Sequence, residues 1–228
     1  MSDVQLARVY QARARGTYWR TQAHCRLPIS VGQAYHEADK LDATIDWVNR
    51  HAGQPFQRCT VVVADTLHRH NHRGADARGR AREAGDSWLA RNRHLLAGLV
   101  IPYRIVRWDA LLQHSSFPAL HAQIQHLAEA GGDFAKALRR ATDAWLARQH
   151  NPPGPDEQMF VRRYLLEEIA AIAVMEQIGP AALCYPGGIK LFETARTAAF
   201  KHLTQSMSWV TPTLADFEMT ELHIRRRS

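Results

Sequence analysis

The chain has 228 residues, of which 46% are hydrophobic and 22% are charged, which suits a globular protein and excludes a disordered or low-complexity one. It contains no run of the ~20 apolar residues that a membrane span needs, and its first residues lack a signal-peptide pattern. Three scattered cysteines, Cys25, Cys59 and Cys184, form neither a C-x-x-C motif nor a disulfide framework. We therefore expect one cytoplasmic, monomeric domain over residues 1–228, with no membrane partner.

The charge is strongly basic and is carried by arginine. Lys and Arg number 29 against 22 Asp and Glu, which gives a formal net charge of +7, and only four of the 29 are lysines. Arginine is the better bidentate partner for phosphate, so a polyanionic partner explains the charge. A GC-rich genome, which also raises the arginine content, is the competing explanation.

The first half of the chain alternates predicted strands and helices. Apolar or β-branched runs at 23–29, 60–64 and 101–106 predict strands, and the run 60–64 suits a central parallel strand covered on both faces. Helical periodicity separates them, first around 41–48. It recurs over 77–99, where one face is expected to hold Ala81, Ala84, Trp88, Leu95 and Leu99. Strand–helix alternation predicts a doubly wound α/β fold with a parallel sheet.

The second half is mostly helical from Asp109 to about Met175, with breaks at Gly131-Gly132 and at 151–155. A short strand at 182–185 follows, stopped by 186–188. A helix and one more strand near 207–211 come next, before a basic tail at 225–227.

Three residues end strands of the predicted sheet, and ligands of open α/β sheets bind outside the carboxyl ends of the strands. These residues are Ser30, Asp65 and Tyr185. Ser30 begins a polar turn containing Gly32, so its hydroxyl could act as a nucleophile at the mouth of the sheet. The alternative is that Ser30 only caps a helix.

A carboxylate stands in an apolar helical row of the second half. Phe160, Tyr164 and Glu168 recur at i, i+4 and i+8, while the neighbouring Glu167 is expected to point elsewhere. A carboxylate in such a row needs a partner or a raised pKa, and such groups are enriched at functional sites. A satisfied structural carboxylate is the alternative.

Arginines line the flanks of the helix predicted over 77–99. They could track a phosphate backbone, and a plain solvated face is the competing interpretation. The residues are Arg78, Arg80, Arg82, Arg91 and Arg93.

Nucleotide and metal motifs are missing. The chain has no P-loop, no G-x-G-x-x-G and no G-x-S-x-G elbow. The histidines of 68–72 lie in a predicted loop without a matching Cys or carboxylate cluster, which makes a zinc site improbable. We expect no cofactor and no metal.

Four segments in order resemble the cyclodipeptide synthases, enzymes that use two aminoacyl-tRNAs to make a cyclic dipeptide. Residues 29–35 (ISVGQAY) look like the family's nucleophile segment, and 62–66 (VVADT) are similar to its second strand. Residues 164–168 (YLLEE) fit its Tyr-x-x-x-Glu helix, and 183–186 (LCYP) fit its late strand with a catalytic Tyr. Each motif is weak alone, but the four together in this order and spacing are fairly specific.

Departures from the larger subfamily point to the second one, named for its Tyr-Pro. Gln33 stands where the larger subfamily has Asn, and Pro186 follows the Tyr where it has His. Pro28 replaces a common Gly two residues before the Ser, which affects the expected shape of the first substrate pocket.

The resemblance implies a Rossmann-like fold similar to class Ic aminoacyl-tRNA synthetase domains, working without ATP. It also implies a ping-pong mechanism in which Ser30 carries an acyl-enzyme, then a dipeptidyl-enzyme, before a 2,5-diketopiperazine is released. Glu168 and Tyr164 would hold the α-ammonium group, and Tyr185 would move protons during cyclisation.

The resemblance also implies a pocket and a tRNA-facing surface. The five arginines of the helix over 77–99 match the family's basic helix in location only. Arg26, if it points inward, could pair with an acidic substrate side chain. The expected pocket residues are Arg26, Pro28, Gln33, Val62, Ala64, Ala171 and Leu183.

Two other functions remain open from the residues. One is a non-catalytic RNA-binding α/β module that keeps the basic helix. The other is a serine hydrolase acting on small esters, which would need a histidine base such as His36.

Overall fold

The computed structural model describes residues 9–72, 74–147, 154–187, 190–206, 214 and 217–227. Within these residues a six-stranded sheet has the order β1-β6-β5-β2-β3-β4. Its strands run parallel except for β1, which pairs antiparallel with β6 at one edge. The strands are β1 (Tyr10–Ala14), β2 (His24–Ile29), β3 (Arg58–Val63), β4 (Tyr103–Arg107), β5 (Ala182–Pro186) and β6 (Thr220–Arg226).

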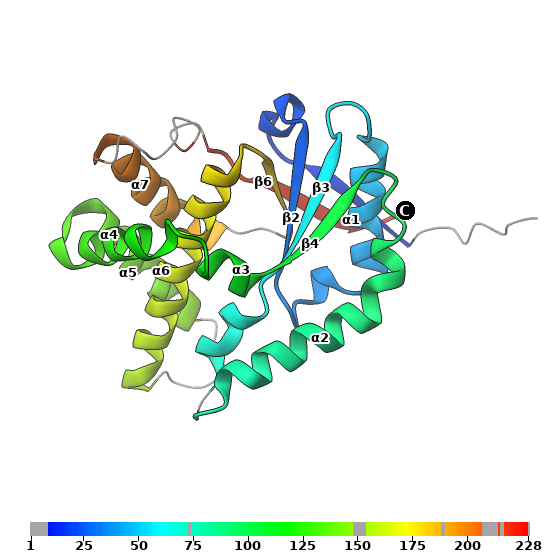
Figure 1. Ribbon diagram of the computed structural model, residues 1–228. Helices are drawn as coiled ribbons and strands as arrows, with labels where there is room; N and C mark the ends of the chain where they lie inside the picture. Colours follow the sequence, from blue (N-terminus) through cyan, green and yellow to red (C-terminus); the bar gives the residue numbers. More distant parts are fainter. Residues whose placement is uncertain are drawn as a thin grey trace, which may run out of the picture.

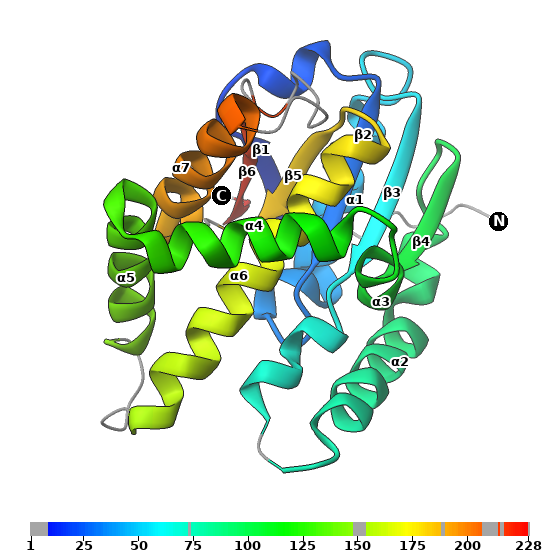
Figure 2. The same ribbon diagram turned by 60° about the vertical axis from the view of Figure 1, so that its left-hand side comes forward.

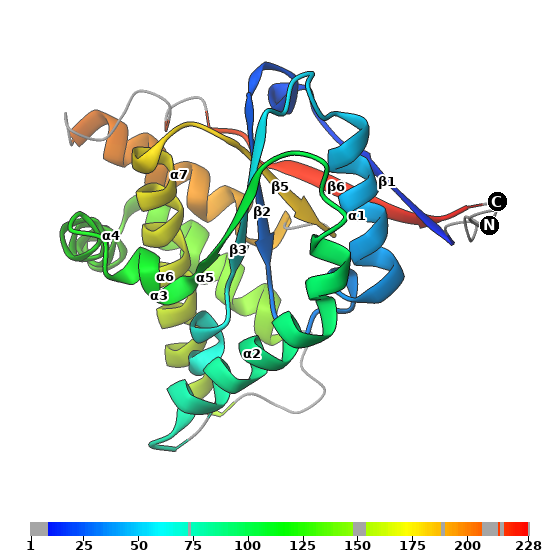
Figure 3. The same cartoon turned by 45° about the vertical axis from the view of Figure 1, so that its right-hand side comes forward.

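Helices cover both faces of this sheet, as Figures 1, 2 and 3 show from three directions. One face carries α1 (Ala38–Arg50) and α2 (Ala77–Leu96). The other carries α3 (Trp108–Leu112), α4 (Phe117–Ala130), α5 (Gly132–Leu146), α6 (Pro155–Ile178) and α7 (Lys190–Ser206). The doubly wound α/β prediction is confirmed.

The alternation of side chains along β3 divides the interior into two cores. Val61 and Val63 pack with the α1 side, and Val62 packs with the α6 side. Because both faces of β3 are covered, its last five residues are buried, which accounts for the unbroken apolar run in the sequence.

The main helical boundaries follow the local signals. Gly131 and Gly132 separate α4 from α5 with φ angles of 86° and 75°, a conformation that favours glycine. Helix α6 starts with Pro155 in its first turn, followed by Asp156 and Glu157, whose negative charge suits a helix N-terminus.

Several predictions about the elements need correction. The edge strand β1 was not anticipated, and residues 225 and 226, expected in a basic tail, belong to β6. The strand expected at 207–211 lies outside the described residues, as does most of the break at 151–155. In α2, Ala84 is exposed and the buried face instead includes Gly85 and Asn92. None of the described helices is long and apolar enough to cross a membrane.

Candidate active site at the carboxyl ends of the strands

The carboxyl ends of β2 and β5 bring two hydroxyl groups together. Ser30 follows β2 directly, and Tyr185 is the fourth residue of β5, which pairs with β2 in parallel. The Ser30 Oγ and the Tyr185 hydroxyl lie 2.9 Å apart, a hydrogen-bond distance. Two residues 155 positions apart in sequence thus form one polar pair, as the strand-end argument predicts.

The turn after Ser30 is held by a buried histidine. The Ser30 backbone N–H donates to Nδ1 of His36 at 2.6 Å, and Nε2 of His36 lies 3.1 Å from the Pro186 carbonyl oxygen. Because Nδ1 accepts, the proton of the neutral ring must sit on Nε2, which donates to that carbonyl. Burial lowers the pKa of His36 to about 4, so the ring stays neutral and joins the ends of β2 and β5.

This arrangement rules out a capping role for Ser30. Helix α1 begins at Ala38 with Glu37 before it, and the short 3-10 helix at Ala34–His36 is preceded by Gln33. Neither helix has a side-chain cap. The Ser30 hydroxyl is instead directed at Tyr185, and Gly32, with a φ of 84°, allows the turn that places it there.

Glu168 and Tyr164 lie within electrostatic reach of the Ser30–Tyr185 pair. Burial raises the pKa of Tyr185 to about 12, with a further contribution from the charge of Glu168, while the hydrogen bond with Ser30 opposes the rise. The pKa of Tyr164 is raised well above its usual value, first by burial and then by Glu168 and Tyr185. The charge of Glu168 therefore acts on both tyrosines, and one of them, Tyr185, is hydrogen-bonded to Ser30.

One oxygen of Glu168 is buried without a hydrogen-bond partner among the described residues. This atom is the carboxylate oxygen Oε2 of a side chain in α6. Burial raises the pKa of Glu168, and the charge of Arg196 partly offsets the rise. A buried acceptor without a donor is costly, so this oxygen is suited to receive an ammonium group from a ligand.

Arg196 is a member of the site that the sequence did not reveal. It lies in α7, is 2% exposed, and its charge lowers the pKa values of Tyr164, Glu168 and Tyr185 alike. Nothing in the local pattern of α7 distinguishes this arginine, because its partners come from α6 and β5.

Glu167 points elsewhere than Glu168, as expected, but its side chain is buried rather than exposed. Glu167 is 5% exposed and accepts hydrogen bonds from Arg69, from Trp108 Nε1 at 2.9 Å, and from His70, whose Nε2 lies 3.1 Å away. Burial alone would raise its pKa, but the bonds from His70 and Arg69 hold it at about 2. Glu167 is therefore a satisfied structural carboxylate, which fastens α6 to the segment after β3.

That segment, the 3-10 helix at Thr66–Asn71, takes the place of the loop predicted at 68–72. Asp65 before it is ion-paired with Arg107, and the Thr66 hydroxyl donates to Asp109 at 2.7 Å. The Asp-Thr ending of β3 therefore anchors neighbouring elements. No group of three or more His, Cys, Asp or Glu side chains in the described part of the chain is arranged to hold a metal ion.

Six of the seven predicted pocket residues divide into three groups. Val62, Ala64, Ala171 and Leu183 are buried together in the α6-side core, against which Tyr164 packs. Pro28 lies in β2 two residues before Ser30 and is partly buried. Gln33 lies exposed in the turn, so its side chain is not part of the buried group.

Arg26 points into the α6-side interior but already has a carboxylate partner. Its Nη1 donates to Glu176 at 2.7 Å, and its Nη2 donates to the carbonyls of Met175 and Gly179 at 2.8 and 2.9 Å. Burial lowers the pKa of Arg26 and raises that of Glu176 to about 7, against their mutual attraction. An acidic substrate side chain would have to compete with Glu176 for this guanidinium.

The arginines of α2 are exposed, but several of them have carboxylate partners. Arg78 and Arg82 lie 3.0 and 3.5 Å from Asp109, and Arg91 lies 3.2 Å from Glu37. Arg80 and Arg93 are also exposed on this helix. Three of the five predicted phosphate-contacting arginines are therefore paired with carboxylates of the same chain.

Comparisons with solved structures agree with the four motifs. A cyclodipeptide synthase from Fluoribacter dumoffii matches with a TM-score of 0.79 and 26% identity, covering 96% of this chain and 100% of the other. A cyclodipeptide synthase from Candidatus Glomeribacter gigasporarum, bound to Phe-tRNAPhe, matches with a TM-score of 0.61 and 19% identity over 90% of this chain and 89% of that one. No family model and no curated relative matches the chain.

An aminoacyl-tRNA synthetase also has a similar fold. A tyrosyl-tRNA synthetase from Archaeoglobus fulgidus matches with a TM-score of 0.53 and 15% identity, covering 89% of this chain and 55% of its own. The Rossmann-like fold expected from the sequence is therefore confirmed. The chain has the fold of the cyclodipeptide synthases, and its similarity to solved members supports the family that its four ordered motifs indicate.

Proposed function

We propose that this protein is a tRNA-dependent cyclodipeptide synthase of the Tyr-Pro subfamily, which joins two aminoacyl groups into a 2,5-diketopiperazine through a Ser30 acyl-enzyme. The observation that carries the proposal is the 2.9 Å pair of Ser30 Oγ and Tyr185 OH, together with the unpartnered oxygen of Glu168, whose charge acts on Tyr185. The structural neighbours add the substrate class, because one of them was solved with an aminoacyl-tRNA.

In the first transfer, Ser30 Oγ attacks the ester carbonyl of an aminoacyl-tRNA. The Oγ–C bond forms, the bond between that carbonyl and the ribose oxygen breaks, and the serine proton ends on the tRNA hydroxyl. An aminoacyl ester is already activated, so a strong base beside Ser30 is not required. With its pKa near 12, Tyr185 keeps its proton at neutral pH and passes one through its hydrogen bond with Ser30 rather than acting as a phenolate.

The second transfer must run in one direction if the dipeptide is to stay on the enzyme. The amine of the Ser30-bound residue attacks the ester of the second aminoacyl-tRNA, and the peptide bond replaces that ester. Attack in the opposite sense would leave the dipeptide on the tRNA. The new terminal amine then attacks the Ser30 ester, which closes the ring and frees the serine.

Glu168 and Tyr164 hold the ammonium group of the first residue. The carboxylate oxygen without a partner supplies the acceptor, and the half-buried Tyr164 lies on the same side of α6 one turn before it. Burial raises the pKa of Glu168, which brings this carboxylate closer to accepting the proton that the amine must lose before it attacks.

Contacts of His36 argue against the serine hydrolase. Both of its ring nitrogens are engaged with backbone groups, Nδ1 with the Ser30 N–H and Nε2 with the Pro186 carbonyl, so neither is aimed at the Ser30 hydroxyl. Product formation distinguishes the synthase from a non-catalytic RNA-binding module. Only the synthase forms a cyclic dipeptide, and only the synthase needs the Ser30 hydroxyl.

The test is synthesis from aminoacyl-tRNAs in vitro. We expect the purified protein, given total aminoacylated tRNA without ATP, to form cyclic dipeptide masses that RNase pretreatment of the tRNA abolishes. Ser30→Ala should form none. Ser115→Ala, which removes an exposed hydroxyl in the segment before α4, is the matched control and should match the wild type.

Three results would reject the proposal. Wild-type protein that makes no product from any aminoacyl-tRNA would favour the RNA-binding module. Ester cleavage that survives RNase would favour the hydrolase. Equal amounts of product from the wild type and Ser30→Ala would exclude a mechanism through a Ser30 acyl-enzyme.

A further inference from the structure

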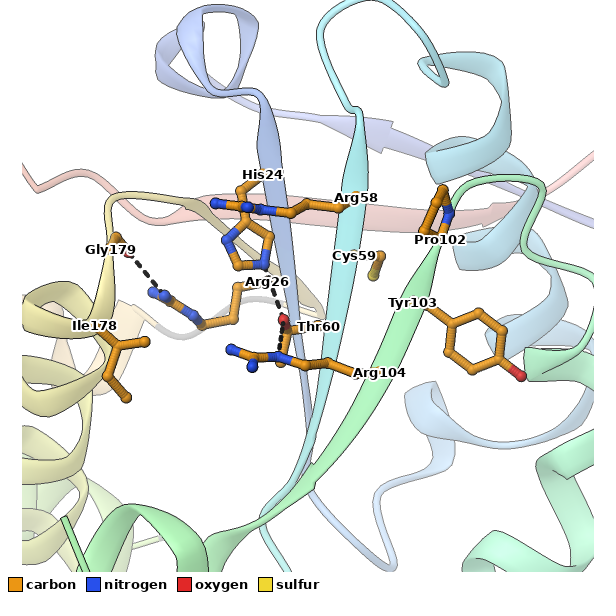
Figure 4. A pocket seen from close by; sticks show the side chains of 10 residues that line it. All are labelled: His24, Arg26, Arg58, Cys59, Thr60, Pro102, Tyr103, Arg104, Ile178 and Gly179. Atoms are coloured by element: carbon orange, nitrogen blue, oxygen red, sulfur yellow. Dashed lines mark hydrogen bonds between the residues drawn. The ribbon is translucent and has the colours of Figure 1, made fainter.

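A cavity lies at the amino ends of the parallel strands, the opposite edge of the sheet from Ser30. It has a volume of about 490 Å³ and opens where β2, β3 and β4 begin and where α6 ends. We call it the basal cavity. Figure 4 shows its lining: His24, Arg26, Arg58, Cys59, Thr60, Pro102, Tyr103, Arg104, Ile178 and Gly179.

The basal cavity gathers positive charge. Arg58 and Arg104 extend from neighbouring strands across the sheet toward β2, on the side where Arg26 lies (Figure 4). None of the lining residues is acidic. Arg26 is ion-paired with Glu176. The guanidinium groups of Arg58 and Arg104 have no carboxylate partner in the described part of the chain.

Polar atoms of these two arginines are available to a ligand. The Arg104 side chain uses only its Nε, which donates to the Thr60 hydroxyl at 3.3 Å, and the Arg58 side chain makes no hydrogen bond to the described residues. The ring of His24 is also bound to Thr60, at 2.9 Å from Nε2. The two terminal nitrogens of each guanidinium group are therefore free to donate hydrogen bonds. Such a pair of donors binds a phosphate or a carboxylate in a bidentate manner.

The pKa of His24 reflects the same excess of positive charge. Burial, together with the charges of Arg26, Arg58 and Arg104, lowers the pKa of His24 to about 4. Arg104 also disfavours the charged form of Arg26. A gathering of like charges without a counterion is unfavourable, and a bound anion would relieve it.

We propose that the basal cavity binds a phosphate group, held between the guanidinium groups of Arg58 and Arg104 with Arg26 behind it. The cavity is larger than one phosphate ion, and the half-exposed Ile178 and Pro102 give it an apolar border. The ligand is therefore either free phosphate or a small phosphate monoester whose organic part lies against these residues. This inference does not depend on the function proposed for Ser30.

The first experiment is calorimetric titration of the full chain with inorganic phosphate and, separately, with phenyl phosphate, both at constant ionic strength. Arg58→Gln and Arg104→Gln should each weaken phosphate binding about tenfold, the effect of losing one hydrogen bond to a charged group. Arg140→Gln, which removes an exposed arginine of α5, is the matched control and should bind as the wild type does. Tighter binding of phenyl phosphate than of phosphate would identify a monoester, and equal binding would identify the free ion.

The second experiment locates the ion, because other basic surfaces of this chain also attract phosphate. Phenylglyoxal modifies accessible arginines, and peptide mass spectrometry gives a rate for each one. Phosphate should slow the modification of Arg58 and Arg104 and leave that of Arg140 unchanged. The proposal is overturned if Arg58→Gln and Arg104→Gln bind phosphate as the wild type does, or if phosphate protects all three arginines equally. Thermal melts of each variant show that it is folded.

Discussion

Removing Arg26 should destabilise the protein in a way that depends strongly on pH. Its guanidinium faces Glu176 at 2.7 Å, and the two side chains are 3% and 0% exposed. Arg26→Leu leaves the carboxylate of Glu176 buried without its cation, and breaking a buried pair in this way costs about 3–5 kcal/mol of unfolding free energy. The other oxygen of Glu176 has no partner among the described residues, so no alternative donor is in place.

The pH dependence follows from the pKa of Glu176. Burial raises this pKa from 4.5 to about 7, so the folded state holds a proton that the unfolded state releases. Stability in the wild type therefore falls as the pH rises from 4.5 to 7, by up to about 3 kcal/mol at ~1.4 kcal/mol per unit. Without Arg26 the pKa rises further. Relative to the wild type, the variant should lose little unfolding free energy at pH 5, where the carboxyl is neutral. The full loss of about 3–5 kcal/mol should appear at pH 8.

Urea unfolding followed by tryptophan fluorescence at pH 5 and pH 8 measures this difference. The double variant Arg26→Leu/Glu176→Leu should regain most of the stability at pH 8, because apolar side chains replace a pair that was costly to desolvate. An equal loss at both pH values for Arg26→Leu would refute the argument, since it would show that packing rather than an unpaired charge sets the cost.

Three further predictions follow from single contacts. Tyr185→Phe removes the hydroxyl that lies 2.9 Å from Ser30 Oγ and should slow dipeptide formation by about 10–100-fold with unchanged melting temperature, measured by product mass spectrometry. Glu167, whose pKa is about 2 against 4.5 in the unfolded chain, contributes stability that is present above pH 4.5 and lost as the pH falls toward 2; Glu167→Gln should flatten acid unfolding followed by circular dichroism over that range. Gly85→Ala would place a Cβ 2.5 Å from that of Asp65 and should lower the unfolding free energy by about 1–3 kcal/mol in urea titrations.

Sequence patterns located the parts of the fold that depend on local periodicity. The unbroken apolar run of β3 identified a central strand, and Gly131-Gly132 identified the break between α4 and α5. The site residues at strand ends, Ser30 and Tyr185, followed from the geometry of a parallel sheet, which brings the carboxyl ends of neighbouring strands to one edge.

Partners that are distant in sequence could not be predicted. Glu167 and Glu168 are adjacent, and the helical row indicated one interior carboxylate; that Glu167 is buried as well depends on Arg69, which is 98 positions away. The buried face of α2 shifted from Ala84 to Gly85 because the side chain of Asp65 packs against the helix there. Local pattern has no information on such contacts.

The central claim is that Ser30 carries an aminoacyl group, and its most direct measurement is the mass of the protein itself. The wild type is mixed with total aminoacyl-tRNA, quenched in acid and digested for peptide mapping. The account predicts an added aminoacyl mass on the peptide that contains Ser30, removable by hydroxylamine. Cyclic dipeptide formed while Ser30 never carries an adduct, or an adduct on another residue, would contradict it.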